Sequence, residues 1–181
     1  MSLKLTKSIV MIGMMGAGKS AIGRALAEVL AVDFVDSDDE IEAAANLKIS
    51  EIFEKYGEAE FRNKEAQVIA RLLDETPKIL ATGGGAFLTD STRKLINEQA
   101  TSVWLNTDLE IAWLRVKDKT HRPLLQTENP KQVLTDMYNA RRETYAKAHL
   151  QIDITSNCSI DVTRDLVLEA LKSNKFVEEQ K

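Results

Sequence analysis

The stretch that decides the fold is IVMIGMMGAGKS, residues 9–20, in which four apolar residues run directly into a segment with three glycines, a lysine and a serine. Glycine is unfavourable in regular structure, so three of them within residues 13–18 indicate backbone that passes close to a ligand. From Gly13 the segment fits the pattern G-x-x-x-x-G-K-[ST], which follows a strand and opens a helix in proteins that bind nucleotide phosphates. The sequence therefore predicts a strand, a phosphate-binding loop and a helix, in that order.

The backbone N–H groups of such a loop, continued by the first turn of the helix, form a positive concavity for phosphate oxygens. We expect Lys19 to reach the β- and γ-phosphates and the Ser20 hydroxyl to bind Mg²⁺. The residues expected to contact the nucleotide here are Gly16, Ala17, Gly18, Lys19, Ser20 and Ala21.

The composition narrows the class of protein. A chain of 181 residues suits one domain, and 44 % hydrophobic with 29 % charged residues is ordinary for a globular protein. The net charge of −4 argues against nucleic acid as a partner, although it allows local arginines around a small anion. The single cysteine, Cys158, cannot form an internal disulfide and is expected to be incidental. With no apolar stretch near the ~20 residues of a membrane helix and no signal peptide in MSLKLTKS, we expect a cytoplasmic protein that binds no membrane.

Strand-like segments at 8–12, 33–35, 78–81, 102–105 and 151–154 alternate with amphipathic helical segments. This alternation is typical of an α/β fold with a parallel sheet. A long helix over about 130–148 begins at Pro130, since proline suits a first turn. Two segments interrupt the pattern: residues 36–56 are helical but longer than a crossover needs, and 117–129 are polar like an exposed lid. We expect both to serve a site within one domain, the insertion covering about 36–63.

Two carboxylates, Asp36 and Asp38, follow the second strand. In extended backbone they would point to the same side, at the sheet edge where α/β proteins bind ligands. A kinase needs one carboxylate near Mg²⁺ and another near the hydroxyl that it phosphorylates. The alternative is a helix N-terminus, because Ser37 through Glu40 would suit a first turn. The phosphate loop upstream favours the metal and acceptor interpretation.

Arginines and a second glycine run follow. Arg62 lies three residues before Glu65 on a helix, where a surface ion pair is one explanation. The run GGG at 83–85 ends a buried-looking strand and indicates another close approach to a ligand. Arg122, in the predicted lid, can fold over the phosphates and stabilise the charge that develops in phosphoryl transfer. Of Arg141 and Arg142 on the long helix, one is expected to face solvent.

These motifs in this order resemble the shikimate kinase family, small P-loop enzymes of the nucleoside-monophosphate-kinase-like fold. The resemblance covers about residues 8–171 and rests on GMMGAGKS, DSD, FRNKE, GGGA, RPLL and the spacing R-x-x-x-Y between Arg141 and Tyr145. It implies a three-layer α/β/α fold with a five-stranded parallel sheet. It also implies Mg²⁺-dependent transfer of the γ-phosphate of ATP to the 3-hydroxyl of shikimate by a monomer.

The resemblance assigns roles to the residues that match the motifs. Asp38 would bind and orient the acceptor hydroxyl, and Arg62 and Arg141 would clamp the carboxylate of shikimate with their planar forks. The remaining roles would be backbone contacts to the ring from Gly83, Gly84 and Gly85, Mg²⁺ binding by Ser20 and Asp36, contacts to the transferred phosphoryl group from Lys19 and Arg122, and adenine stacking by Arg115.

Two other functions stay open at this point. Another small-molecule P-loop kinase, for example one that acts on gluconate, would share the phosphate loop and differ in the acceptor pocket. A nucleotide-binding regulatory module would have lost Lys19, Asp38 or Arg122, all of which are present. One departure from the family pattern is Ala81, where many relatives carry serine or threonine, with Thr82 next to the glycines.

Overall fold

The computed structural model describes residues 3–119, 125–156 and 158–179. Its strands are β1 (Leu3–Leu5), β2 (Ile9–Ile12), β3 (Phe34–Asp36), β4 (Ile79–Ala81), β5 (Thr101–Thr107), β6 (Leu150–Ile154) and β7 (Val177–Glu179). Its helices are α1 (Lys19–Leu30), α2 (Ser37–Ala45), α3 (Ile49–Asp74), the 3₁₀-helix η1 (Ala86–Leu88), α4 (Asp90–Gln99), α5 (Leu109–Val116), α6 (Pro130–Tyr145) and α7 (Ile160–Ser173). Within these ranges, no helix is both long and apolar enough to cross a bilayer.

Five strands form one parallel sheet in the order β3-β4-β2-β5-β6. The central strand is β2, whose four residues are all buried, as expected for a parallel strand that is covered on both faces. The predicted strands are confirmed with small shifts at their ends; β5 is longer than expected because it extends to Thr107.

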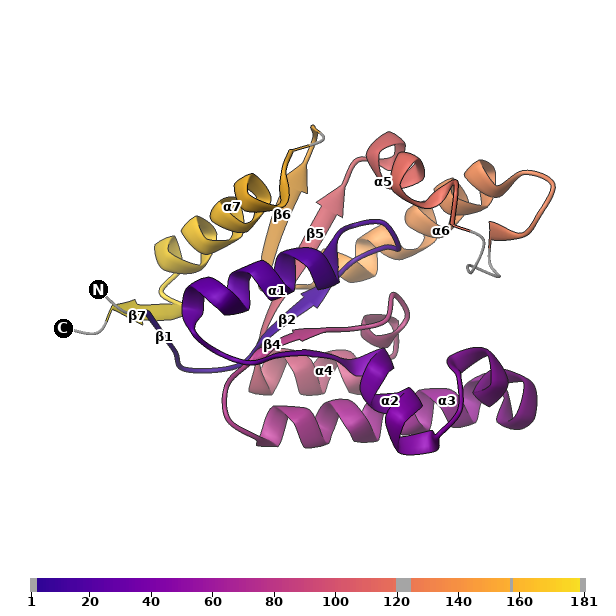
Figure 1. Cartoon of the computed structure of the whole chain (residues 1–181), viewed down its shortest axis with the longest axis horizontal. Coiled ribbons are helices and arrows are strands. Elements are labelled where there is room, and N and C mark those ends of the chain that lie inside the picture. Colours follow the sequence, from indigo (N-terminus) through magenta and orange to yellow (C-terminus); the bar gives the residue numbers. More distant parts are fainter. Residues whose placement is uncertain (1–2, 120–124, 157, 180–181) are drawn as a thin grey trace.

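Helices cover both faces of the sheet, which confirms the predicted three layers (Figure 1). Alternate residues of β2 point to opposite faces. Ile9 and Met11 pack in the core cluster formed with α1 and α7, whereas Val10 and Ile12 pack in the cluster formed with α3, α4 and α6. The side chains of β2 therefore join both halves of the core.

The predicted helical insertion is two helices that pack on each other around Ile41, Ile52 and Phe61. The chain turns between them at Asn46, and Gly57 interrupts the helical backbone inside α3. The second part of α3 then continues into the layer that covers the sheet. That residues 36–63 act as a substrate-binding unit stays a prediction.

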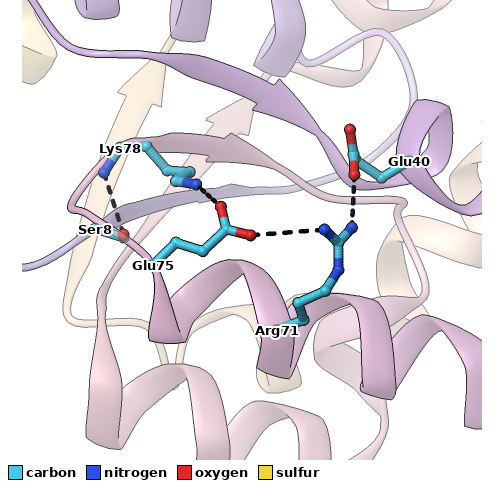
Figure 2. A network of polar contacts seen from close by, with 5 residues as sticks. All are labelled: Ser8, Glu40, Arg71, Glu75 and Lys78. Atoms are coloured by element: carbon cyan, nitrogen blue, oxygen red, sulfur yellow. Dashed lines mark hydrogen bonds and ion pairs between the residues drawn. The ribbon is translucent and has the colours of Figure 1, made fainter.

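A chain of polar contacts connects this insertion with the far end of the sheet (Figure 2). Arg71 of α3 contacts Glu40 of α2 at 2.6 Å and Glu75 at 3.5 Å. Glu75 in turn pairs with the ammonium of Lys78, a side chain only 6 % exposed, and the Lys78 backbone N–H donates to the Ser8 hydroxyl at 3.2 Å. Ion pairs of this kind are individually weak at a surface. Together they link α2, whose first turn contains Asp38, to the strand ends at Ser8 and Lys78.

A second, two-stranded sheet was not predicted. β1 pairs antiparallel with β7, so the two ends of the described chain lie side by side (Figure 1). Each strand has three residues, too few for a period-2 pattern to stand out, and their pairing depends on contacts between opposite ends of the chain.

A partly buried polar cluster connects α4, β5 and the start of β6. The Ser102 backbone N–H donates to Nδ1 of His149 at 3.1 Å, which requires the neutral imidazole with its proton on Nε2. The Ser102 hydroxyl donates to Asn97 at 2.6 Å and accepts from the His149 backbone N–H at 2.9 Å. Burial, with a smaller contribution from Lys7, lowers the pKa of His149 below its usual 6.5.

We expect acid to weaken the fold through His149. Below about pH 6.5 the unfolded chain takes up a proton that the folded protein resists, so the free energy of unfolding falls as the pH is lowered from 7.5 toward 5. Thermal unfolding of wild type and of His149→Gln across this range measures the effect, and the difference between their melting temperatures should change with pH. A constant difference would contradict the assignment of the neutral imidazole.

Candidate active site

The loop over residues 13–18 joins β2 to α1 and is shaped as an anion site. Gly16 and Gly18 have φ values of 78° and 92°, in the left-handed region that favours glycine. Gly18 caps α1 without any side-chain hydrogen bond, and the first turn of α1 contains no acidic residue. The N–H groups and positive dipole at this end therefore remain for an anionic ligand. Lys19 lies across the loop, its ammonium donating to the carbonyls of Gly13 and Met14 at 2.8 and 2.9 Å.

Ser20 and Asp36 meet at the same edge of the sheet. The Ser20 hydroxyl donates to Oδ2 of Asp36 at 2.8 Å, and Oδ1 of Asp36 accepts from the Asp38 backbone N–H at 3.0 Å. Asp36 is thus the N-cap of α2, so the helix-terminus alternative is correct for the backbone. The expected extended backbone at Asp38 is wrong, because this residue lies in the first turn of α2. Both carboxylates nevertheless line the cavity.

The residues at this edge suit Mg²⁺. Ser20 and Asp36 supply the oxygen ligands that this cation prefers, and Mg²⁺ commonly takes one or two protein ligands and completes its shell with water and phosphate oxygens. In the described part of the chain, no three His, Cys, Asp or Glu side chains converge on a metal position. The Thr82 hydroxyl donates to the Met11 carbonyl at 3.3 Å, so it is already engaged with the neighbouring strand.

Asp38 and Glu65 face each other across Gly83. A Cβ on Gly83 would lie 3.0 Å from Oδ1 of Asp38 and 3.3 Å from Oε1 of Glu65, and neither oxygen has a hydrogen-bond partner among the described residues. Burial raises the pKa of Asp38 to about 6, helped by the negative charges of Asp36 and Glu65 and opposed by Lys19. Asp38 is therefore a carboxylate with one oxygen that has no donor among the described residues, and its pKa of about 6 lies well above that of an ordinary aspartate.

Arg62 is held between Glu65 and the glycine run. Its Nη1 contacts Oε2 of Glu65 at 2.6 Å, and the Glu65 side chain is only 2 % exposed. Burial raises the pKa of Glu65, opposed by the hydrogen bond and charge of Arg62. A Cβ on Gly85 would lie 2.2 Å from Nη2 of Arg62, well below the van der Waals contact distance of carbon and nitrogen. A surface pair was one explanation of the spacing in sequence, and it is wrong: the structure shows a buried Glu65 carboxylate that holds Arg62.

The other predicted residues lie around the same space. Arg141 is next to Gly84, and Arg115 donates to the Gly16 carbonyl at 3.1 Å, beside the phosphate loop. Ala17 does not line the cavity: it is 1 % exposed and packs in the core. Arg122 and the centre of the predicted lid, 120–124, lie outside the described residues.

One cavity of about 840 Å³ is lined both by the phosphate loop and by the residues around the glycine run. Its size suits small ligands. Sequence reasoning missed its apolar wall, where the rings of Phe53 and Phe61 lie 4.6 Å apart. It also treated Cys158 as incidental, yet Cys158 lines the cavity, and its thiol lies 2.9 Å from the Ser156 hydroxyl. The further lining residues that it did not assign are Met15, Ile22, Ile49, Lys119, Ser159, Ile160 and Thr163.

A phosphate loop on a central parallel strand, with carboxylates and arginines in the same cavity, defines a P-loop kinase of small molecules. Residues 15–172 match the family model described as shikimate kinase. The chain is 51 % identical over 175 residues to a shikimate kinase of Ruegeria pomeroyi, covering 97 % of this chain and 90 % of the relative. It is 53 % identical over 150 residues to one of Cereibacter sphaeroides, covering 83 % and 75 %.

Comparison with solved structures indicates the same family. The crystallised shikimate kinase of Acinetobacter baumannii, in complex with shikimate, superposes with a TM-score of 0.86 at 39 % identity over 93 % of this chain and 94 % of that one. The chain belongs to the shikimate kinase family, which transfers phosphate from ATP to shikimate.

We predict that Gly85→Ala displaces Arg62 while the protein still folds. The backbone of Gly85 is right-handed, with φ −94° and ψ −15°, so alanine adds no backbone strain, and the three atoms nearest to its methyl group all belong to the Arg62 guanidinium. The KM for shikimate should rise roughly tenfold or more, the loss expected for one charged contact, while the KM for ATP stays unchanged and the melting temperature falls because the buried Glu65 carboxylate loses its partner. Steady-state kinetics and thermal unfolding check this, and an unchanged KM for shikimate would contradict it.

Asp38→Asn should stabilise the unliganded protein. The pKa of Asp38 is about 6 when folded and 3.8 ordinarily, so the folded state is penalised as the pH rises from about 4 to about 6 and carries the full cost at neutral pH. That cost is on the order of 3 kcal/mol, which predicts a melting temperature at pH 7.5 higher by about 5 °C or more. The exposed neighbour Asp39→Asn is the control and should match wild type. A melting temperature for Asp38→Asn below that of wild type would contradict the prediction.

Proposed function

We propose that this chain phosphorylates the 3-hydroxyl of shikimate with ATP by holding both substrates in the one cavity described above. The observation that carries this proposal is that the phosphate loop, Asp38 and the two arginines Arg62 and Arg141 all line that cavity. Phosphoryl transfer has a loose transition state, so positioning and charge stabilisation matter more than strong base catalysis.

At the nucleotide end, the loop N–H groups and the first turn of α1 would bind the phosphates of ATP. Lys19, which contacts the carbonyls of Gly13 and Met14, would turn its ammonium to the β- and γ-phosphates. Arg115 lies beside Gly16 and Gly18, which supports its assignment to the adenine side of the site. Arg122 would cover the transferred group from the lid.

At the acceptor end, Arg62 and Arg141 would clamp the carboxylate of shikimate. Arg62 is oriented by a buried carboxylate, and two guanidinium groups allow this acidic protein to attract an acidic substrate because local potential outweighs net charge. The backbone of Gly83, Gly84 and Gly85 would lie against the ring. A Cβ at Gly83 would crowd Asp38, and one at Gly85 would collide with Arg62.

Asp38 would accept a hydrogen bond from the hydroxyl that is phosphorylated. As the hydroxyl oxygen bonds to the γ-phosphorus, the bond to ADP breaks and the hydroxyl proton passes to Asp38 late in the transfer. A pKa of about 6 leaves most of the Asp38 carboxyl ionised at neutral pH, so that it can accept the proton, and makes it a better base than an ordinary aspartate.

Ser20 and Asp36 would hold Mg²⁺, Asp36 either directly or through water. The cation supplies charge neutralisation between the β- and γ-phosphates. We also propose that the enzyme works as a monomer, since the residues assigned to both substrates belong to one chain, and that it works in the cytoplasm, because its one cysteine suits a reducing compartment.

A coupled assay of ADP release with ATP and Mg²⁺ tests the proposal, with shikimate, gluconate or no acceptor. We expect release that depends on shikimate, stops when EDTA removes Mg²⁺, and falls by at least about a hundredfold in Asp38→Asn. Asp39→Asn serves as the matched control. Release with gluconate alone would discard the acceptor assignments, and nucleotide binding without release would favour a regulatory module.

A further inference from the structure

The hydroxyl of Tyr145 lies where α6, the glycine run and the phosphate loop meet. Tyr145 is the last residue of α6, and its side chain is fully buried, with the ring 5.9 Å from that of Trp104. The hydroxyl donates to the Gly84 carbonyl at 2.5 Å and lies 3.9 Å from the sulfur of Met14. Phenylalanine would fill the same core volume, so the hydroxyl itself requires an explanation.

Arg141 stands one helical turn before Tyr145, so the two side chains share a face of α6. Both approach the same glycine: a Cβ on Gly84 would lie 3.5 Å from Nη1 of Arg141 and 3.7 Å from the Tyr145 hydroxyl. Burial raises the pKa of Tyr145, although the neighbouring charge of Arg141 opposes it. The hydroxyl therefore keeps its proton at neutral pH and remains a donor.

We infer that Tyr145 is a positioning residue for the acceptor, whose hydroxyl fixes both the Gly84 carbonyl and the guanidinium of Arg141. The inference rests on the proposed function, in which Arg141 binds the carboxylate of shikimate. The same hydroxyl contacts Gly84 on the acceptor side and Met14 of the phosphate loop. It therefore sets where the acceptor lies relative to the γ-phosphate.

The test is Tyr145→Phe, which removes one oxygen and keeps the ring in the core. The value of kcat/KM for shikimate should fall roughly tenfold, mostly through KM, because a buried hydrogen bond is lost at the binding site. The KM for ATP should stay within about twofold, since the nucleotide contacts are unchanged. Tyr138→Phe is the matched control on the same helix: its hydroxyl donates to Asn106 at 3.0 Å rather than to the glycine run, so its kinetics should equal those of wild type.

A double-variant cycle separates positioning from general stability. Arg141→Lys keeps the charge but loses the planar fork, so adding Tyr145→Phe to it should lower kcat/KM for shikimate by less than about threefold. The inference would be overturned if Tyr145→Phe still caused a full tenfold loss in the Arg141→Lys background. It would also be overturned if Tyr145→Phe alone raised both KM values equally, had wild-type kinetics or failed to fold. Wild-type protein without shikimate-dependent release would instead overturn the proposed function, and this inference with it.

Discussion

The site depends on β2 lying between β4 and β5 in the centre of the parallel sheet. Parallel pairing brings the carboxyl ends of all these strands to one edge, so the loops that leave them are neighbours in space. The phosphate loop follows β2, the glycine run follows β4, and Asp36 ends β3. Arg115 reaches the loop from α5 on the other side. Were β2 at an edge, nucleotide and acceptor residues could not line one cavity.

The cations that line the cavity outnumber its carboxylates, since two lysines and three arginines face Asp36, Asp38 and Glu65. Glu65 pairs with Arg62, and Asp36 binds the Ser20 hydroxyl and caps α2. These pairings hold the arginine and the serine in place, whereas Oδ1 of Asp38 has no hydrogen-bond donor among the described residues. A chain with net charge −4 can in this way present a local positive field to two anionic substrates.

What could be predicted from sequence follows from the range of each interaction. The strands of the parallel sheet, the phosphate loop and the start of α6 at Pro130 each depend on a few neighbouring residues, and the structure confirms all of them. The pairing of β1 with β7 and the burial of Glu65 depend on residues far away in sequence, so no local pattern reveals them. Tyr145 was visible only as a spacing from Arg141, because a core tyrosine and a positioning tyrosine look alike until the partner of the hydroxyl is known.

The candidate site reduces the stability of the folded chain. Asp38 has a raised pKa, and one oxygen of Asp38 and one of Glu65 have no donor among the described residues, arrangements that a fold selected for stability alone would avoid. Acceptor hydroxyls would supply the Asp38 carboxylate with hydrogen bonds, so binding offsets part of the cost of burial. In the proposed function, that compensation would favour a polyol over an apolar ligand of the same size, and Arg62 and Arg141 would add the requirement for a carboxylate. The specificity of the pocket would then arise partly from carboxylate oxygens that have no donor among the described residues.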